Sequence, residues 1–219
     1  MMPKSNSTLD ETTSVPPKAQ ANAAPLGLSS FAMTLFVFSM YLIGTGGVVN
    51  HNVALGLALF YGGFIQVLAG IFEMMRGDIF HGTIFPSFGG YWICFGFINY
   101  DATGILSSYK DNPEMLRNAL GIFLVGWTIF AFIMLLCALK SNLVLITILS
   151  LLVIINTLLT TATFTGLKSF EVAGGVFGVI AAFCAWYLAL ALILQKESSY
   201  FTLKTWPIER IHTLSTDKV

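Results

Sequence analysis

Blocks of about 20 apolar residues, separated by short polar segments, constrain the fold of this chain more than any other feature. A helix needs about 20 residues to cross a hydrocarbon core ~30 Å thick, because each residue rises about 1.5 Å. Only 10% of the residues are charged, whereas a soluble domain carries about 25%. The sequence therefore predicts an all-α membrane protein with six transmembrane helices.

The spans define the expected organisation of the chain. The predicted tails are a disordered N-terminal tail at 1–22 and a C-terminal tail at 196–219, on either side of a six-helix domain at 23–195. The N-terminal tail has no apolar core, so we expect no cleavable signal peptide and a first span that acts as the targeting signal. The predicted spans are residues 28–49, 53–75, 79–100, 118–139, 143–164 and 172–194.

The third span is the least regular of the six. Pro86 lies within it, and a proline removes a backbone donor and clashes with the preceding turn. Glycines at 77, 82, 89 and 90 add further weak points. Non-helical backbone at membrane depth persists only in contact with protein or a water-filled cavity. We therefore predict a broken third span, in which a helix N-terminus near Pro86 would offer partial positive charge to a carboxylate.

The lysines and arginines predict the orientation of the chain. Eight of them fall on the side that would hold both termini, and three fall on the opposite side. Because cytoplasmic segments carry the excess of positive charge, both termini are predicted to be cytoplasmic. The eight are Lys4, Lys18, Arg76, Lys140, Lys196, Lys204, Arg210 and Lys218, and the three are Lys110, Arg117 and Lys168.

Two polar residues of the second span, Gln66 and Glu73, are expected to face protein or a cavity, because a charge in lipid is costly. They are seven residues apart and so share one helix face, with Gly70 between them. Glu73 and Gln66 are candidates for a permeation path, and Glu73 could take up a proton during transport because burial disfavours a charged carboxylate. An ion pair between Glu73 and Arg76 is the structural alternative.

The fifth span is polar toward one end. Asn156 and Thr160 share one face, and Thr157 and Thr161 share the adjacent face. These hydroxyls either bond back to helix carbonyls or line a hydrated vestibule for a small polar solute. Asn156 and Thr160 are therefore further candidates for the path.

Nothing in the sequence predicts catalysis, a cofactor or a metal. No nucleophile elbow, zinc-protease helix, phosphate-binding loop or cofactor fingerprint occurs. His51 and His81 fit no metal-ligand spacing, and we expect them to be solvated residues of a loop and a helix end. The formal net charge is zero, which gives no indication of nucleic-acid binding.

Two stretches resemble the acetate and succinate transporter family of bacteria and fungi. That family begins its first span with the signature NPAPLGL, and alanine replaces the first proline here at position 23. A Phe-Tyr-Gly-Gly run in the second span and a tryptophan in the third add to the resemblance. The matching positions are Asn22, Ala23, Ala24, Pro25, Leu26, Gly27, Leu28, Phe60, Tyr61, Gly62, Gly63 and Trp92.

The resemblance implies a homo-hexamer with a pore in each protomer. It implies that the pore carries acetate, and in some members succinate, and that this transport is coupled to protons. It also implies that Phe31, Phe88 and Leu152 narrow the pore. Bacterial members have a tyrosine at the position of Phe88, so the hydroxyl is missing here. Apolar rings can gate a pore by excluding water until they move.

The sequence thus predicts a transporter of small carboxylates, and not an enzyme, in the plasma membrane. Such a protein is needed because desolvating the charge of a small anion prevents it from crossing lipid unaided. An ammonia or ammonium channel is the alternative within transport. A non-transporting receptor or scaffold is the alternative outside it.

Overall fold

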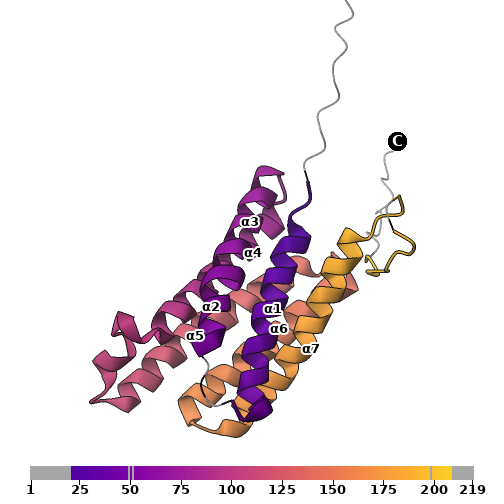
Figure 1. Ribbon diagram of the computed structural model, residues 1–219. Helices are drawn as coiled ribbons and strands as arrows, with labels where there is room; N and C mark the ends of the chain where they lie inside the picture. The colour runs from indigo at the N-terminus through magenta and orange to yellow at the C-terminus, as the bar shows by residue number, and fades with distance from the viewer. Residues whose placement is uncertain (1–20, 49, 51, 198, 209–219) are drawn as a thin grey trace, which may run out of the picture.

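Long helices that run up and down form the described part of the chain, which comprises residues 21–48, 50, 52–197 and 199–208 of a computed structural model. Figure 1 shows them side by side, and the first and the last run closely together. The second helical segment, Asn52–Met75, is continuous but has three parts, α2, η2 and α3. The middle part, η2 (Leu57–Ile65), is π-helical. The elements are α1 (Ala24–Ile43), α2 (Asn52–Gly56), η2 (Leu57–Ile65), α3 (Gln66–Met75), α4 (Ile79–Asn99), α5 (Pro113–Ala138), α6 (Leu143–Thr165) and α7 (Lys168–Ile193).

Among the described residues, five helical segments are long and apolar enough to cross a membrane: α1, Asn52–Met75, α5, α6 and α7. This confirms an all-helical, multi-pass membrane protein. The remaining segment, α4, has 21 residues but is less apolar, because it carries four glycines, a histidine and a proline. The predicted third span, which would bring the number of spans to six, therefore stays a prediction.

Several helix ends differ from the predicted spans for local reasons. The first helix ends before Gly44, whose left-handed backbone (φ 80°) closes it. The predicted fourth span starts at Asn118, but the helix begins at Pro113, because the Asn112 side chain accepts a hydrogen bond from the backbone N–H of Met115. The last helix begins four residues earlier than predicted, at Lys168. Val49, His51 and most of the predicted N-terminal tail lie outside the described residues.

The predicted break in the third span is not observed. Helix α4 continues through Pro86, and the irregular backbone lies in the second span, in η2. The Pro86 ring packs where a Cβ on Gly70 of α3 would stand, so close contact with a neighbouring helix accommodates it. No helix end lies at Pro86, so the positive charge expected there is absent.

Glycines bring α4 against the second segment in antiparallel contact. Gly82, Gly89 and Gly96 are seven residues apart and share a face. A Cβ on them would meet Met74, Val67 and Leu59, respectively. The close approach of the two backbones is the kind of packing on which membrane helices depend.

We expect Gly70→Ala to disrupt this packing, because its new methyl group would overlap the rigid Pro86 ring. The variant should lose about 1–3 kcal/mol of stability, measured as a lower melting temperature in detergent. Gly56→Ala, in the same span with open space around it, is the matched control and should be neutral or slightly stabilising. Equal melting temperatures for the two variants would contradict this packing.

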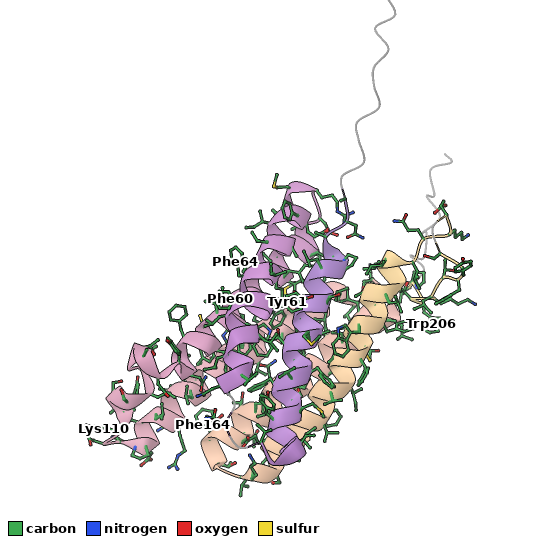
Figure 2. The ribbon with its side chains drawn as sticks, in the orientation of Figure 1. Phe60, Tyr61, Phe64, Lys110, Phe164 and Trp206 are labelled. Carbon is green, nitrogen blue, oxygen red and sulfur yellow. The ribbon has the colours of Figure 1, made fainter. Side chains whose placement is uncertain are left out.

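The described part of the predicted C-terminal tail packs back onto the bundle. Leu143 N–H donates to the carbonyl of Trp206, and the Tyr187 hydroxyl donates to the carbonyl of Lys204 (2.7 Å). Figure 2 shows Trp206 beside the end of α7, where its ring stacks on Tyr187. This segment therefore fastens the α5–α6 turn to α7.

Candidate functional site

Three cavities follow one another through the bundle between α1, α4 and α6. The wide cavity, of about 260 Å³, lies at the end of the bundle where α4 and α6 end. The narrow cavity and the His81 cavity hold about 20 Å³ each, which is room for one water molecule. Characteristic lining residues are Asn99, Thr163 and Glu171 for the wide cavity, Trp92 and Asn156 for the narrow cavity, and Gln66 and His81 for the His81 cavity.

Phe31, Phe88 and Leu152 line both the narrow cavity and the His81 cavity, and no other residue of the described ranges lines both. We name these three residues the first ring. Each is buried, and the ring centroids of Phe31 and Phe88 are 6.4 Å apart. The structure therefore brings together the residues that the resemblance assigns to the constriction, at the boundary between two cavities.

A second ring, which sequence reasoning missed, separates the narrow cavity from the wide one. Its members are Phe38, Tyr91 and Leu159, from the same three helices. Phe38 and Leu159 lie seven residues beyond Phe31 and Leu152, and so occupy the same helix faces two turns on. That spacing is the signal that could have revealed them.

The narrow cavity holds two polar groups between the rings. Asn156 lines it and donates Nδ2 to the carbonyl of Leu152 (2.9 Å). Trp92 also lines this cavity, and its buried indole nitrogen has no hydrogen-bond partner in the described part of the chain. Such an unpaired donor is costly to bury, which suits a site that a polar solute or water visits.

Thr160 lies outside the path formed by these cavities. Its hydroxyl donates to the carbonyl of Asn156 (2.7 Å) and lies 3.3 Å from the Thr128 hydroxyl of α5. Thr157 and Thr161 likewise bond back to carbonyls four residues earlier. These threonine hydroxyls therefore bond back to carbonyls of their own helix, which is the structural one of the two uses expected from the sequence.

The two polar residues of the second span have different surroundings. Gln66 is 1% exposed and lines the His81 cavity, and its Oε1 lacks a hydrogen-bond partner among the described residues. Glu73 is fully buried but lines none of the three cavities. Of the pair, Gln66 alone lines one of the three cavities.

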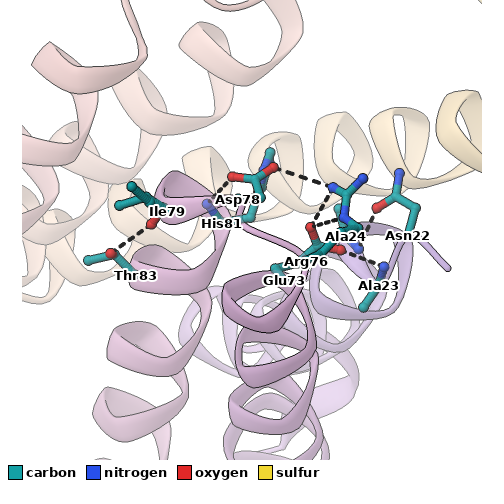
Figure 3. Close-up of polar contacts among 9 residues, drawn as sticks. All are labelled: Asn22, Ala23, Ala24, Glu73, Arg76, Asp78, Ile79, His81 and Thr83. Atoms are coloured by element: carbon teal, nitrogen blue, oxygen red, sulfur yellow. Dashed lines mark hydrogen bonds and ion pairs between the residues drawn. The ribbon is translucent and has the colours of Figure 1, made fainter. Parts of the chain in front are cut away.

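Glu73 fastens the start of α1 to the end of α3 (Figure 3). Its Oε1 accepts the backbone N–H of Ala23 (2.5 Å), and its Oε2 accepts Nε and Nη2 of Arg76 (3.0 and 2.5 Å). The ion pair with Arg76 is the structural alternative predicted from the sequence. Each carboxylate oxygen therefore has a partner, as a buried charge requires.

Asp78 and His81 extend this polar cluster to the His81 cavity (Figure 3). Asp78 caps α4 by accepting the His81 backbone N–H (3.0 Å), and its Oδ2 lies 2.8 Å from His81 Nδ1. Partial burial alone would raise the pKa of Asp78. The hydrogen bonds and charge of His81 and the charge of Arg76 outweigh this effect, so the pKa of Asp78 lies below its ordinary value. Stability from these contacts is therefore present above the ordinary pKa of Asp78 and lost as the pH falls through its lowered value.

One nitrogen and two carboxylate oxygens from Glu73, Asp78 and His81 lie within 4.8 Å of one another, close enough to hold a metal ion. The Arg76 guanidinium, however, already binds Glu73 Oε2 and lies 3.4 Å from Asp78 Oδ2. Because a cationic side chain occupies the centre of the acidic pair, the donor set fits an ion-pair network better than a metal.

The signature positions serve helix packing around the path. A Cβ on Gly27 would meet the Phe85 ring, and one on Gly62 would meet Thr34. Leu28 is buried and lines the His81 cavity, whereas Leu26 is exposed. Phe60 projects outward from η2 in Figure 2. Gly27 and Gly62 thus set how closely the third and second spans, respectively, approach α1.

Known proteins share both the sequence and the fold of this chain. The model of the GPR1/FUN34/yaaH family matches residues 6–210. Ammonia transport outward protein 2 of Saccharomyces cerevisiae is 44% identical over 199 residues, which cover 91% of this chain and 69% of that protein. Acetate permease A of Emericella nidulans is 38% identical over 200 residues, which cover 87% of this chain and 67% of that protein.

A solved structure is similar as well. The bacterial acetate channel SatP is 28% identical, with a TM-score of 0.71, and the match covers 84% of this chain and 99% of the SatP chain. The match therefore extends over nearly all of that channel.

Proposed function

Because this chain belongs to the GPR1/FUN34/yaaH family, we propose that it transports acetate and related short carboxylates across a membrane. The observation that carries this proposal is the pair of apolar rings that divide three cavities between α1, α4 and α6. Acetate-transporting relatives and the acetate channel SatP support acetate as the solute. The two rings make this row of three cavities a gated path for a solute and not an enzyme active site.

The proposed assembly follows the family. Helix α4, the third span in chain order, completes the six spans. Its 21 residues at about 1.5 Å each extend about 31 Å, enough for a hydrocarbon core. We place both termini in the cytoplasm and the protein in the plasma membrane. Self-association as a hexamer would cover apolar residues that α5 exposes, among them Ile122, Ile129, Phe132, Ile133 and Leu136.

The proposed path begins in the wide cavity. The carboxylate crosses the second ring, meets Asn156 and the Trp92 indole in the narrow cavity, and crosses the first ring. Donors between the rings replace part of its hydration, while the rings keep water out until they move. Glu73 holds Ala23 and Arg76, so its contacts favour a structural role over proton coupling.

An ammonia channel is the second candidate, because two relatives are named for outward ammonia transport. A pH-sensitive dye inside proteoliposomes separates the two. Entry of acetic acid acidifies the lumen, whereas entry of ammonia makes it alkaline. Uptake of labelled acetate, or acidification where a proton enters with it, that exceeds protein-free vesicles supports carboxylate transport, and acceleration only with ammonium salts would favour the second candidate.

Tyr91→Phe tests the second ring. The hydroxyl that Phe88 lacks is supplied one turn along α4 by Tyr91, which borders both the wide and the narrow cavity. Removing it should lower acetate uptake about three- to tenfold, the loss expected for one hydrogen bond of about 1 kcal/mol, with little change in stability. Unchanged initial rates of labelled acetate uptake would contradict this role for Tyr91.

A further inference from the structure

We propose that His81 and Gln66 form a carboxylate-binding site at the α4 N-terminal end of the path, where His81 exchanges a proton with the solute. The site deepens the proposed transport of carboxylates and depends on it. Two independent observations support it: an imidazole oriented by a carboxylate, and an unpaired amide oxygen in the same cavity.

The contacts of His81 determine which of its nitrogens is available. Nδ1 lies 2.8 Å from Asp78 Oδ2, and an ionised carboxylate can only accept, so Nδ1 carries a proton and donates it. The ring packs beside Phe85 with its centroid 5.3 Å from that ring. The second nitrogen, Nε2, is left for a ligand in the cavity. It donates when the imidazole is protonated and accepts when it is neutral.

Gln66 faces the same cavity from the second span. A side chain that is 1% exposed with an unpaired Oε1 is costly unless a partner arrives, because a buried acceptor loses its bond to water. A carboxylic acid brings such a partner in its O–H. Water can satisfy the same atom when no solute is present.

Among the described residues, the charged groups that contact His81 or one another beside the cavity come from residues 73–81. Asp78 faces His81, while Arg76 pairs with Glu73 and also contacts Asp78. The cavity walls from α1 and α6 are apolar and include Leu28, Leu145, Ile148 and Leu149. With Arg76 already paired, protonated His81 is the positive group that a carboxylate meets there.

Proton exchange would lower the barrier at the first ring. In the exchange, the Nε2–H bond of protonated His81 breaks and an O–H bond forms on the carboxylate. The cation and the anion become a neutral imidazole and a neutral acid. A carboxylic acid ordinarily holds its proton less tightly than imidazole, but an apolar surrounding favours the neutral pair. A solute that enters from the α4 N-terminal end, in the direction opposite to the one described above, then crosses Phe31, Phe88 and Leu152 as the neutral acid at a far lower desolvation cost. Because His81 is partly exposed, solvent can return its proton.

The pH profile of acetate uptake tests the site. Initial rates in proteoliposomes are measured from pH 5 to 8 without a pH gradient. The wild-type rate should show an inflection within this range, and His81→Gln should lose it together with at least tenfold of the rate at pH 7. Thr83→Ala, on the exposed side of α4, is the matched control and should retain both.

Asp78→Asn gives a second readout that a merely structural role would not produce. Removing the anion beside His81 favours the neutral imidazole, so the inflection should move to lower pH while uptake persists. This result decides the question even if His81→Gln does not fold. A His81→Gln profile identical to wild type, or an unmoved inflection in Asp78→Asn, would overturn the site while leaving acetate transport intact. No wild-type uptake would instead overturn the proposed function, and the site with it.

Discussion

Phe88→Ala is expected to widen the first ring and to raise uptake of succinate relative to acetate about tenfold, which corresponds to about 1.4 kcal/mol in barrier height. The Phe88 ring is 5% exposed and packs against Phe31, Phe130 and Trp127, with ring centroids 5.5 to 6.4 Å away. Its loss would join the narrow cavity to the His81 cavity, because both are lined by this side chain. Uptake of the two labelled acids into proteoliposomes measures the ratio.

The same truncation also removes a buried aromatic ring, at a cost of about 3–5 kcal/mol of stability, so rates are compared per mole of folded protein. Phe36→Ala is the matched control, since Phe36 of α1 packs against Phe183 and Trp186 and lines none of the three cavities. The control should keep the wild-type ratio of the two rates. Equal ratios for Phe88→Ala, Phe36→Ala and wild type would contradict a gate at Phe88.

Glu73→Ala is expected to lower stability by about 2–3 kcal/mol, measured as a fall in melting temperature in detergent. In the wild type, the Glu73 carboxylate is fully buried and accepts hydrogen bonds from both the Arg76 guanidinium and the Ala23 N–H. The change removes this shared acceptor from both donors. Because Arg76 is about one-third exposed, water recovers part of the loss, which places the expected cost below that of a fully buried pair.

Glu73→Gln separates this structural role from proton coupling. The amide keeps an acceptor for one partner and should lose less stability than alanine, while the pH profile of acetate uptake should match that of wild type. If Glu73→Gln instead abolished the pH dependence with an unchanged melting temperature, Glu73 would be a proton carrier and not a structural residue.

Much of the fold follows from the length and composition of the apolar blocks. Blocks of about 20 residues predict spans because only a helix can satisfy its own backbone in lipid. The ends of those spans are less predictable, because they depend on local caps such as Gly44 and Asn112. The break expected at Pro86 is absent for a tertiary reason: Gly70, on another helix, makes room for the proline ring.

The candidate site is predictable in part. Family resemblance points to Phe31, Phe88 and Leu152, and the structure shows them at one boundary between cavities. Periodicity alone could not identify Tyr91, because an aromatic residue on an apolar face is ordinarily a packing residue. Asp78 and His81 have the spacing of a helix cap, but only the three-dimensional structure places that cap beside Gln66 and Phe31.

Acetate transport by this chain is tested most directly by uptake of labelled acetate into proteoliposomes that contain the purified protein. We expect uptake well above that of protein-free vesicles, suppressed by an excess of other short carboxylic acids. A wild-type rate equal to that of protein-free vesicles, with protein that is folded and inserted, would show that the chain does not carry acetate.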